Sequence, residues 1–218
     1  MKLKYLGHAS FLITASDGTR IITDPYESGY RNGMISYGPI KEKADVVFIT
    51  HEHGDHNYLG DIQGSPQVLR GPGVHQAKGI EFKGIATFHD NVQGAERGRN
   101  TIFCFTIDGI RVCHMGDLGH WLSQPQITEM GNVDVVLTPM GGRSQIDAPT
   151  ATELTTRMRA RVIIPMHFKT PQIGFELAPV EAFTKGKNNV QTVEGSEVEY
   201  TKETLPVTPQ VLVLQPAL

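Results

Sequence analysis

The sequence predicts an α/β sandwich, and three observations favour it over an all-β barrel. Many short apolar runs are separated by Gly, Pro, Asn and Asp, as expected for strands joined by turns. One run, residues 45–50 (DVVFIT), is apolar throughout its centre, which is typical of a buried strand. Residues 149–160 have the apolar spacing of a helix, so helices are expected to cover the strands.

The predicted strands follow one another along the chain with few interruptions. Residues 25–42 are the main exception, because they are rich in Gly and Tyr without periodicity and are predicted to form a loop. Strands are expected at residues 2–6, 10–14, 20–24, 45–50, 67–70, 84–88, 101–107, 110–114, 134–138, 161–165, 198–200 and 211–214.

Two helices are expected in the second half of the chain. In the longer one, residues 149–160, Thr150 and Glu153 have the spacing of a capping box. Residues 179–185 predict a second, shorter helix.

Length and composition indicate one domain spanning residues 1–218. Apolar residues make up 39% and charged residues 20%, and the formal net charge is -3. No Lys/Arg-rich run predicts a nucleic-acid partner, and no apolar run approaches the roughly 20 residues that span a bilayer. The N-terminal residues are interpreted as a strand rather than a signal peptide. We therefore expect a cytoplasmic protein that acts on a small molecule; a homo-oligomer is compatible with this sequence.

The two cysteines flank a predicted hairpin turn at Asp108-Gly109. That turn would place Cys104 opposite Cys113, so a cross-strand disulfide is sterically conceivable. In a cytoplasmic core, two reduced and buried thiols are the favoured expectation.

The strongest chemical signal is a cluster of ligand-type side chains directly after the strand at residues 45–50. His51, His53, Asp55 and His56 lie within six residues, and Gly54 lets the backbone turn between them. Neutral imidazole and carboxylate groups bind zinc, manganese or ferrous iron. A polar loop that carries histidines by chance is a poor alternative at this density.

Further ligand candidates each follow a different apolar run. His89 comes after residues 84–88, and Asp117 comes shortly after residues 110–114. His167 comes directly after Met166, at the end of a third run. Strand ends that meet at one edge of a sandwich present reactive groups on a rigid scaffold, so these residues are expected to join the first cluster.

The chain resembles the metallo-β-lactamase-fold hydrolases over nearly its whole length, most specifically in the HxHxDH motif from His51 to His56. Within that superfamily it is similar to the branch that includes phosphorylated-ascorbate lactonase and many uncharacterised metal-dependent hydrolases. The other segments that carry the resemblance are residues 6–9 (LGHA), 23–25 (TDP), 88–90 (FHD), 114–117 (HMGD) and 165–167 (PMH).

The resemblance implies a four-layer αββα sandwich with two metal ions at one edge. It assigns three residues to each metal and one residue, Asp117, to both. The first metal would be bound by His51, His53 and His89, and the second by Asp55, His56 and His167. His114 is expected to pack within its strand instead.

Several further polar residues lie close to the predicted ligands in the sequence or at other strand ends. His120, three residues after Asp117, would either contact the substrate and protonate the leaving group or bond only to backbone. Asp24 and His8 end predicted strands and are expected to support the metal ligands. His75 is expected at the surface.

Basic residues near the predicted strand ends would meet an anionic substrate group. Arg97, Arg99 and Asn100 follow His89, although a solvated turn is the favoured explanation for them. Arg143 and Lys169 offer the same two interpretations.

The chemistry implied by the resemblance is hydrolysis. Two divalent cations, with zinc favoured and manganese the alternative, would lower the pKa of water from 15.7 toward about 7. Asp55 would orient that water and accept its proton. The target would be the carbonyl group of an ester or lactone, or a phosphoester; the sequence does not decide between them.

Two alternatives use the same scaffold without hydrolysis. In the di-iron redox members of the superfamily, the motif has Glu at the position of His53. The histidine in this chain favours a zinc-type or manganese-type hydrolase. A non-catalytic metal-binding protein is the other alternative, and the complete set of seven expected ligands disfavours it.

Overall fold

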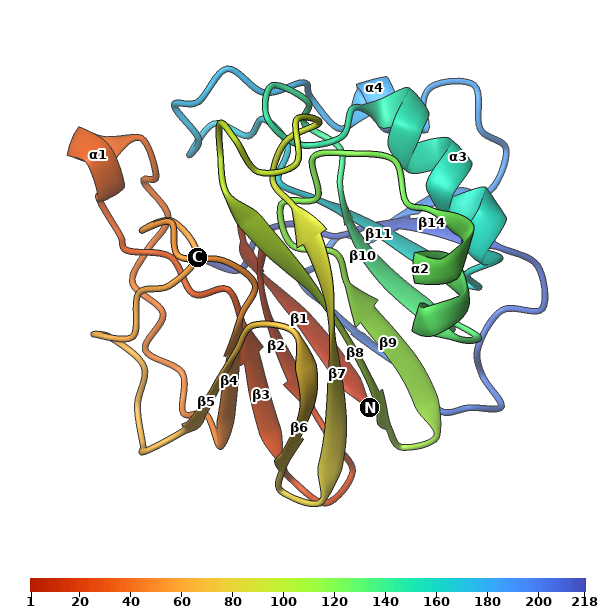
Figure 1. The fold of residues 1–218 in the computed structure, drawn as a ribbon. Helices are drawn as coiled ribbons and strands as arrows, with labels where there is room; N and C mark the ends of the chain where they lie inside the picture. Colours follow the sequence, from red (N-terminus) through yellow and green to blue (C-terminus); the bar gives the residue numbers. More distant parts are fainter.

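The computed structural model describes all 218 residues, and its strands form two sheets that pack face to face (Figure 1). The six-stranded sheet has the order β13-β1-β2-β3-β4-β5, and the eight-stranded sheet has the order β12-β14-β11-β10-β9-β8-β7-β6. The six-stranded sheet contains β1 (Lys2–Gly7), β2 (Ser10–Thr14), β3 (Arg20–Thr23), β4 (Val46–Ile49), β5 (Gln67–Arg70) and β13 (Glu197–Glu199). The eight-stranded sheet contains β6 (Gly73–Ala77), β7 (Ile80–Phe88), β8 (Arg99–Ile107), β9 (Ile110–His114), β10 (Val135–Pro139), β11 (Val162–Met166), β12 (Val190–Thr192) and β14 (Gln210–Val213).

Apolar side chains from both sheets fill the space between them, and together with apolar residues of the helices on the outer face of the eight-stranded sheet they form one cluster of 49 buried residues. Aromatic rings are at its centre: Phe48 of the six-stranded sheet lies 4.8 Å from Phe103 of the other, measured between ring centroids. Phe82 and Phe105 extend this contact at 4.9 Å. These separations are in the range that aromatic pairs favour, so the cluster fixes the two sheets against each other.

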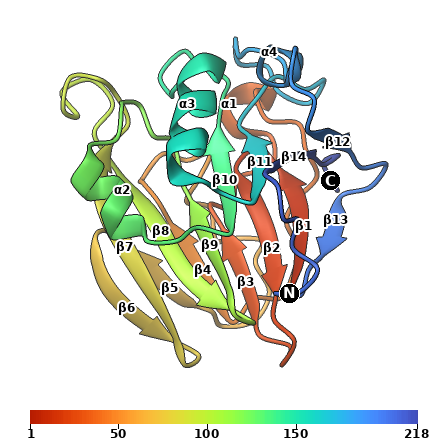
Figure 2. The same cartoon turned by 90° about the vertical axis from the view of Figure 1, so that its right-hand side faces the viewer.

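Helices cover the outer face of the eight-stranded sheet (Figure 2). They are α2 (Gln124–Met130), α3 (Ala148–Met158) and α4 (Glu181–Thr184). None of the helices has the length and apolar character needed to cross a membrane.

The outer face of the six-stranded sheet is covered mainly by the connection between β3 and β4. A second apolar cluster of 12 buried residues lies there and includes Tyr26, Ile35 and Tyr37 of this connection. Its helix α1 (Tyr30–Gly33) is one distorted turn, because Arg31 and Asn32 have φ of 48° and 58°. The predicted α/β fold class is confirmed, with a loop in place of long helices on this side.

Helix α3 begins earlier than the capping-box spacing indicated. Its N-cap is Asp147, whose side chain accepts a hydrogen bond from the backbone N–H of Thr150 at 3.0 Å. Pro149 fits the first turn because that turn does not need its missing N–H group. Helix α2 was not expected, although Ser123 and Gln126 form a complete capping box at its start.

The expectation of two reduced thiols is wrong for this structure, in which Cys104 and Cys113 form a disulfide. The two residues are direct partners in the β8–β9 hairpin, and their Cα atoms are 4.3 Å apart. That distance is typical of a non-hydrogen-bonded antiparallel pair, in which the two side chains come closest. The register of the hairpin therefore brings the two sulfur atoms together.

Candidate metal centre

Four strands from both sheets end at the same edge of the sandwich and deliver the candidate ligands. The motif from His51 to His56 follows β4 in the six-stranded sheet. His89 follows β7, Asp117 lies three residues beyond β9, and His167 follows β11, all in the eight-stranded sheet. The structure thus brings together all seven residues that the sequence suggested as metal ligands.

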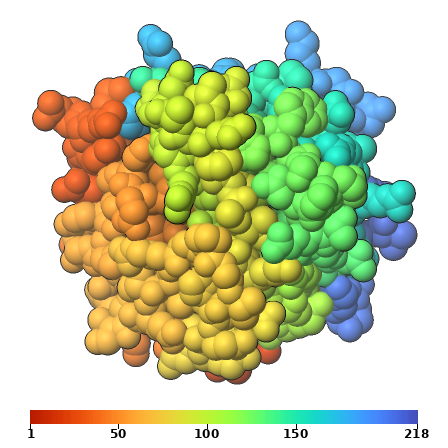
Figure 3. All heavy atoms as spheres, viewed as in Figure 1, coloured from red at the N-terminus to blue at the C-terminus, as the bar shows by residue number.

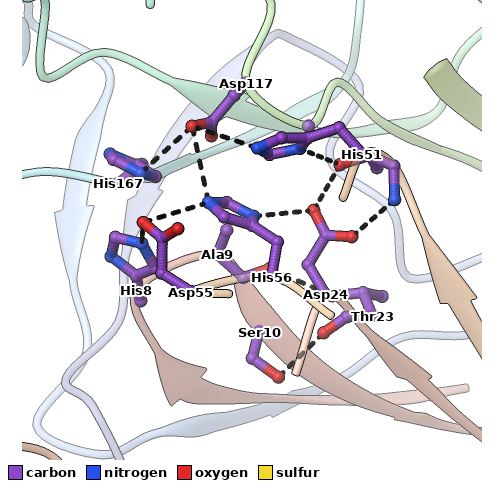
Figure 4. Close-up of polar contacts among 12 residues, drawn as sticks. His8, Ala9, Ser10, Thr23, Asp24, His51, Asp55, His56, Asp117 and His167 are labelled. Atoms are coloured by element: carbon purple, nitrogen blue, oxygen red, sulfur yellow. Dashed lines mark hydrogen bonds and ion pairs between the residues drawn. The ribbon is translucent and has the colours of Figure 1, made fainter. Parts of the chain in front are cut away.

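The carboxylate of Asp117 is the point at which these side chains meet. Its Oδ2 atom lies 3.1 Å from Nε2 of His89, 3.4 Å from Nε2 of His56 and of His167, and 3.9 Å from Nε2 of His51. Figure 4 shows it between the imidazoles of His51, His56 and His167. Asp117 is therefore the carboxylate around which four of the candidate imidazoles gather.

The remaining donors form three overlapping groups, and within each group the ligand atoms lie within 4.8 Å of one another. One group is His51, His53 and His89, and a second is His8, Asp55, His56 and His167. The third group, Asp24, His51 and His56, shares one histidine with each of the others. The first two groups contain the two ligand sets that the resemblance implies, with His8 as an additional member of the second.

His8 approaches the second group through Asp55. Its Nε2 atom donates to Oδ2 of Asp55 at 3.2 Å, and its ring centroid lies 4.0 Å from that of His167. The side chain of His8 is fully buried. His8 is therefore part of the cluster, as its position at the end of a strand suggested.

Asp24 supports two ligands from beneath the cluster (Figure 4). Its Oδ2 atom accepts from Nδ1 of His56 at 3.1 Å and from the hydroxyl of Thr50 at 2.6 Å. Because that hydroxyl donates to Asp24, it accepts from Nδ1 of His51 at 3.0 Å. Both imidazoles are thereby oriented with Nε2 toward the cluster, which is how a neighbouring carboxylate commonly supports a metal-binding histidine.

Buried polar atoms without hydrogen-bond partners indicate that this cluster fits a metal. They include Nε2 of His51, Nε2 of His56 and Oδ1 of Asp117. Such atoms are costly in a protein interior, and all three belong to the groups that meet at the cluster. Imidazole and carboxylate donors suit divalent zinc or manganese, so the residues present fit a cation in each of the first two groups.

Burial and neighbouring charges shift the pKa values of these residues in both directions. Burial lowers the pKa of His51 well below its ordinary value, and lowers the pKa of His167 to about 3. Burial also opposes ionisation of Asp117, but the nearby His167 and His56 outweigh it and keep its pKa well below the usual range. Burial opposes protonation of His56, but Asp117 and Asp55 outweigh it and raise its pKa, so a metal would displace a proton there.

Two residues in the connection between β10 and α3 contribute to the cluster without having been expected. Nε2 of Gln145 donates to Oδ2 of Asp117 at 2.8 Å. The backbone carbonyl of Ser144 lies 3.3 Å from Nδ1 of His89 and orients that ring. No sequence pattern marks either residue, because the connection has no periodicity. Thr50 was also missed, although it directly precedes His51.

The structure places several other candidates away from the cluster. Nε2 of His120 accepts from the backbone N–H of Phe88 at 3.1 Å, and its Nδ1 lies 2.8 Å from the carbonyl oxygen of Trp121. Both ring nitrogens thus contact backbone, which is the second of the two interpretations of His120. His114 is fully buried against the carbonyl oxygen of Ala9, within its strand as expected.

Of the basic residues suggested by the sequence, some line a pocket at the cluster and others do not. Nζ of Lys169 donates to the carbonyl oxygens of Ile173 and Phe175, so it stabilises a loop. Asn100 is buried, and its Oδ1 accepts from the backbone N–H of Asp117 at 3.0 Å. Arg97 and Arg143 line a pocket over the metal cluster, together with Arg31. His75 is half-buried, with Nε2 2.9 Å from the carbonyl oxygen of Gly71.

Comparison with known proteins agrees with this geometry. The profile of the β-lactamase superfamily domain matches residues 2–167. A UPF0173 metal-dependent hydrolase from Thermococcus onnurineus is 26% identical over 197 residues, covering 78% of this chain and 85% of that protein. Another from Pelotomaculum thermopropionicum is 28% identical over 229 residues, covering 91% of this chain and 96% of that protein.

A solved structure gives the same result. A protein from Thermotoga maritima, assigned as a Zn-dependent hydrolase of the metallo-β-lactamase superfamily, is 35% identical and has a TM-score of 0.81. The match covers 98% of this chain and 97% of that one. The chain therefore belongs to the metallo-β-lactamase superfamily of metal-dependent hydrolases.

Proposed function

We propose that the protein is a hydrolase that uses two divalent metal ions to cleave an ester, a lactone or a phosphoester. The observation that carries the proposal is the position of Asp117, whose Oδ2 lies between 3.1 and 3.9 Å from four imidazoles. Two of those imidazoles, His51 and His89, share a donor group with His53, and the other two, His56 and His167, share a donor group with Asp55 and His8. A single carboxylate shared by two such groups is the arrangement expected at a dinuclear centre.

The bound cations would supply hydroxide at neutral pH and neutralise negative charge that develops on the substrate. The chain's own contribution centres on Asp55, which is half-buried at the pocket floor. Burial opposes its ionisation, but His56 and His8 lower its pKa, so Asp55 is a carboxylate. Asp55 would orient the attacking water and accept its proton, while the hydrogen bond from His8 holds the side chain in place.

The ligand set favours zinc, with manganese as the alternative. Histidine supplies most of the donors, and imidazole nitrogen is a preferred zinc ligand. Elemental analysis of protein purified without added metal would identify the ion. An iron content of two per chain with an absorption band in the visible region would favour the redox alternative over hydrolysis.

Substitution of individual ligands tests the proposed centre. We expect His53→Ala and Asp117→Ala each to abolish turnover and to remove at least one metal ion per chain, because each removes a donor that no neighbour replaces. Metal content would be measured by elemental analysis and activity with the metal-loaded protein. His75→Ala is a matched control, since His75 lies outside both donor groups. Full activity and full metal content in Asp117→Ala would contradict the assignment.

The class of bond that is cleaved needs a separate experiment. The metal-loaded protein would be assayed with lactones, aryl esters and phosphodiesters, each with zinc and with manganese. Turnover of only the carbonyl compounds would assign a lactonase or esterase, and turnover of only the phosphodiesters would assign a phosphodiesterase. If no compound is cleaved while both metals are bound, a metal-binding protein without catalytic activity becomes the better description.

A further inference from the structure

The pocket over the metal cluster is bordered by three arginines that come from separate segments of the chain. Arg31 lies in α1, Arg97 in the connection between β7 and β8, and Arg143 in the connection between β10 and α3. They line the same pocket as the cluster residues His53 and Asp55. In the space-filling view, α1 and the β7–β8 connection stand at the same upper end of the molecule (Figure 3).

None of these three guanidinium groups has a hydrogen-bonding or ion-pair partner in the structure. The only carboxylates that line the pocket are Asp55 and Asp117, which belong to the metal cluster. The positive charge at the pocket mouth is therefore not neutralised by the protein. Three other arginines of the chain form ion pairs, Arg20 with Glu42, Arg70 with Glu52, and Arg161 with Asp134, whereas the exposed Arg99 and Arg159 are also without a partner but do not line this pocket.

The backbone holds at least two of these arginines in defined positions. Asp90 accepts four backbone N–H bonds within the β7–β8 connection, including one of 2.7 Å from Arg97 itself. Arg143 has a left-handed backbone with φ of 66°. Such a conformation is unfavourable for a residue with a side chain and persists where the surrounding structure imposes it. Arg97 and Arg143 therefore lie in loops whose backbone conformation is defined by local contacts.

We propose that Arg31, Arg97 and Arg143 bind an oxyanion, a phosphate or a carboxylate, that a small substrate carries apart from the bond being cleaved. Guanidinium groups present several donors in a planar fork that matches the oxygens of both anions. Phe175 and Leu177 line the same pocket and offer apolar contact to the organic part of the substrate. This assignment of substrate class rests on the proposed hydrolase function.

Three matched esters test the proposal with the zinc-loaded protein. The 4-nitrophenyl esters of hexanoic acid, adipic acid and 5-phosphonopentanoic acid share the leaving group and chain length, but end in methyl, carboxylate and phosphonate. We expect kcat/KM to be at least tenfold higher for an anionic ester than for the hexanoate. Arg31→Gln, Arg97→Gln and Arg143→Gln should each reduce that preference by about three- to tenfold, because each removes a charged hydrogen bond that is partly screened by water. The triple variant should bring the ratio close to one.

Arg159→Gln provides the matched control. Arg159 is exposed, has no side-chain hydrogen bond or ion pair and does not line this pocket, so the variant loses the same charge and should keep the wild-type preference. Preference for the adipate ester would assign the oxyanion as a carboxylate, and preference for the phosphonate ester would assign a phosphate; both support the proposal. Equal kcat/KM for all three esters in the wild-type protein would overturn it.

A binding measurement separates this proposal from the proposed function. If none of the esters is hydrolysed, the hydrolase assignment fails, but the anion site is still tested by calorimetric titration with 5-phosphonopentanoic acid. Binding that is at least tenfold weaker in the triple variant than in the wild type supports the site. Equal binding by the two proteins, or no binding by either, rules it out.

Discussion

At the residue scale, three residues of the metal cluster have backbone conformations that side chains normally avoid. His8, Asp24 and His167 have φ of 56°, 37° and 53°. Conformations of this kind cost of order 1–3 kcal/mol each and persist only when other contacts impose them. For His8 those contacts are visible, because its carbonyl oxygen accepts from the hydroxyl of Tyr5 and from the backbone N–H of His167, both at 2.9 Å. These backbone conformations direct the side chains of His8 and His167 into the cluster and that of Asp24 toward the ligand His56.

Asp24→Asn tests whether the support beneath the cluster matters for metal binding. The amide keeps an oxygen for the backbone N–H of Thr50 but removes the negative charge beside Nδ1 of His56. We expect at least one metal ion to bind about 10–100-fold more weakly, as is typical when the supporting partner of a ligand is lost. Competition with a chromogenic chelator would measure the affinity. Asp17→Asn, in an exposed turn, should bind as the wild type does; unchanged affinity in Asp24→Asn would contradict the supporting function.

Individual site residues differ in how far the sequence could reveal them. His51, His53 and His56 were predictable because their density has no good structural explanation. Gln145 was not, because its position depends on the path of an irregular connection. For His120, closeness in sequence was misleading. His120 lies three residues after Asp117, but the backbone N–H of Gly119 between them donates to the carbonyl oxygen of Phe88 and the chain turns there. The direction of the His120 side chain therefore could not be inferred from its distance to Asp117 along the chain.

At the scale of elements, the strands that the sequence missed are those at the two edges of the eight-stranded sheet. β6 and β12 are the terminal strands of that sheet, and most of their residues are exposed or half-buried. An edge strand with both faces partly in water has no reason to alternate apolar and polar residues, so periodicity cannot find it. The central strands β10 and β11 are buried at every position and were predicted within a residue or two.

Asp45 contacts residues at β3 and at the β6–β7 turn, and these contacts predict how the stability of the fold depends on pH. It precedes β4, its Oδ2 accepts from the backbone N–H of Arg20 at the start of β3 at 3.0 Å, and its Oδ1 lies 3.4 Å from Nζ of Lys78 between β6 and β7. The hydrogen bond from Arg20 lowers the pKa of Asp45. A lowered folded-state pKa contributes stability that is fully present above the unfolded value of about 3.9 and is lost as the pH falls through the folded value.

We therefore expect Asp45→Ala to reduce the free energy of unfolding by about 0.5–1 kcal/mol at pH 7, an estimate reduced for solvent screening. The difference from the wild type should shrink as the pH falls below about 4. Urea unfolding of the metal-free proteins at several pH values would measure it. Glu153→Ala, on the exposed face of α3, should show little change at any pH. If the difference in unfolding free energy between the two proteins grew toward acid pH, the predicted direction of the pH dependence would be wrong.

At the scale of the whole molecule, the candidate metal centre lies where the two sheets meet at one edge. His51 and His56 come from the six-stranded sheet, whereas His89, Asp117 and His167 come from the eight-stranded sheet. Metals bound there would link the sheets in addition to the shared core. The general fold was predictable from strand patterns and from the resemblance. Residues 25–42 were predicted as a loop, but their packing over the six-stranded sheet was not predictable, because it depends on contacts distant in sequence.

Removal of metal should consequently weaken that edge more than the opposite one. A ligand at 100 times its Kd stabilises the folded state by about 2.7 kcal/mol, which for a chain of this size corresponds to roughly 5–10 °C in Tm. We expect a chelator to lower Tm by this amount and to increase hydrogen exchange at the cluster ends of β4, β7, β9 and β11. Asp117→Ala should respond less to the chelator. Uniform exchange changes along these strands would contradict the link.

The spacing of the ligands also sets an order of events during synthesis. His51 to His56 leave the ribosome as a ready group of four donors, while His167 follows 111 residues after His56. At 5–20 residues per second, the early donors wait roughly 6–22 s for the residue that completes the second group. Throughout that interval any cation bound to the nascent loop lacks His167, and until Asp117 emerges, 61 residues after His56, it also lacks that carboxylate. The choice of metal must therefore be made, or corrected, by the finished sandwich.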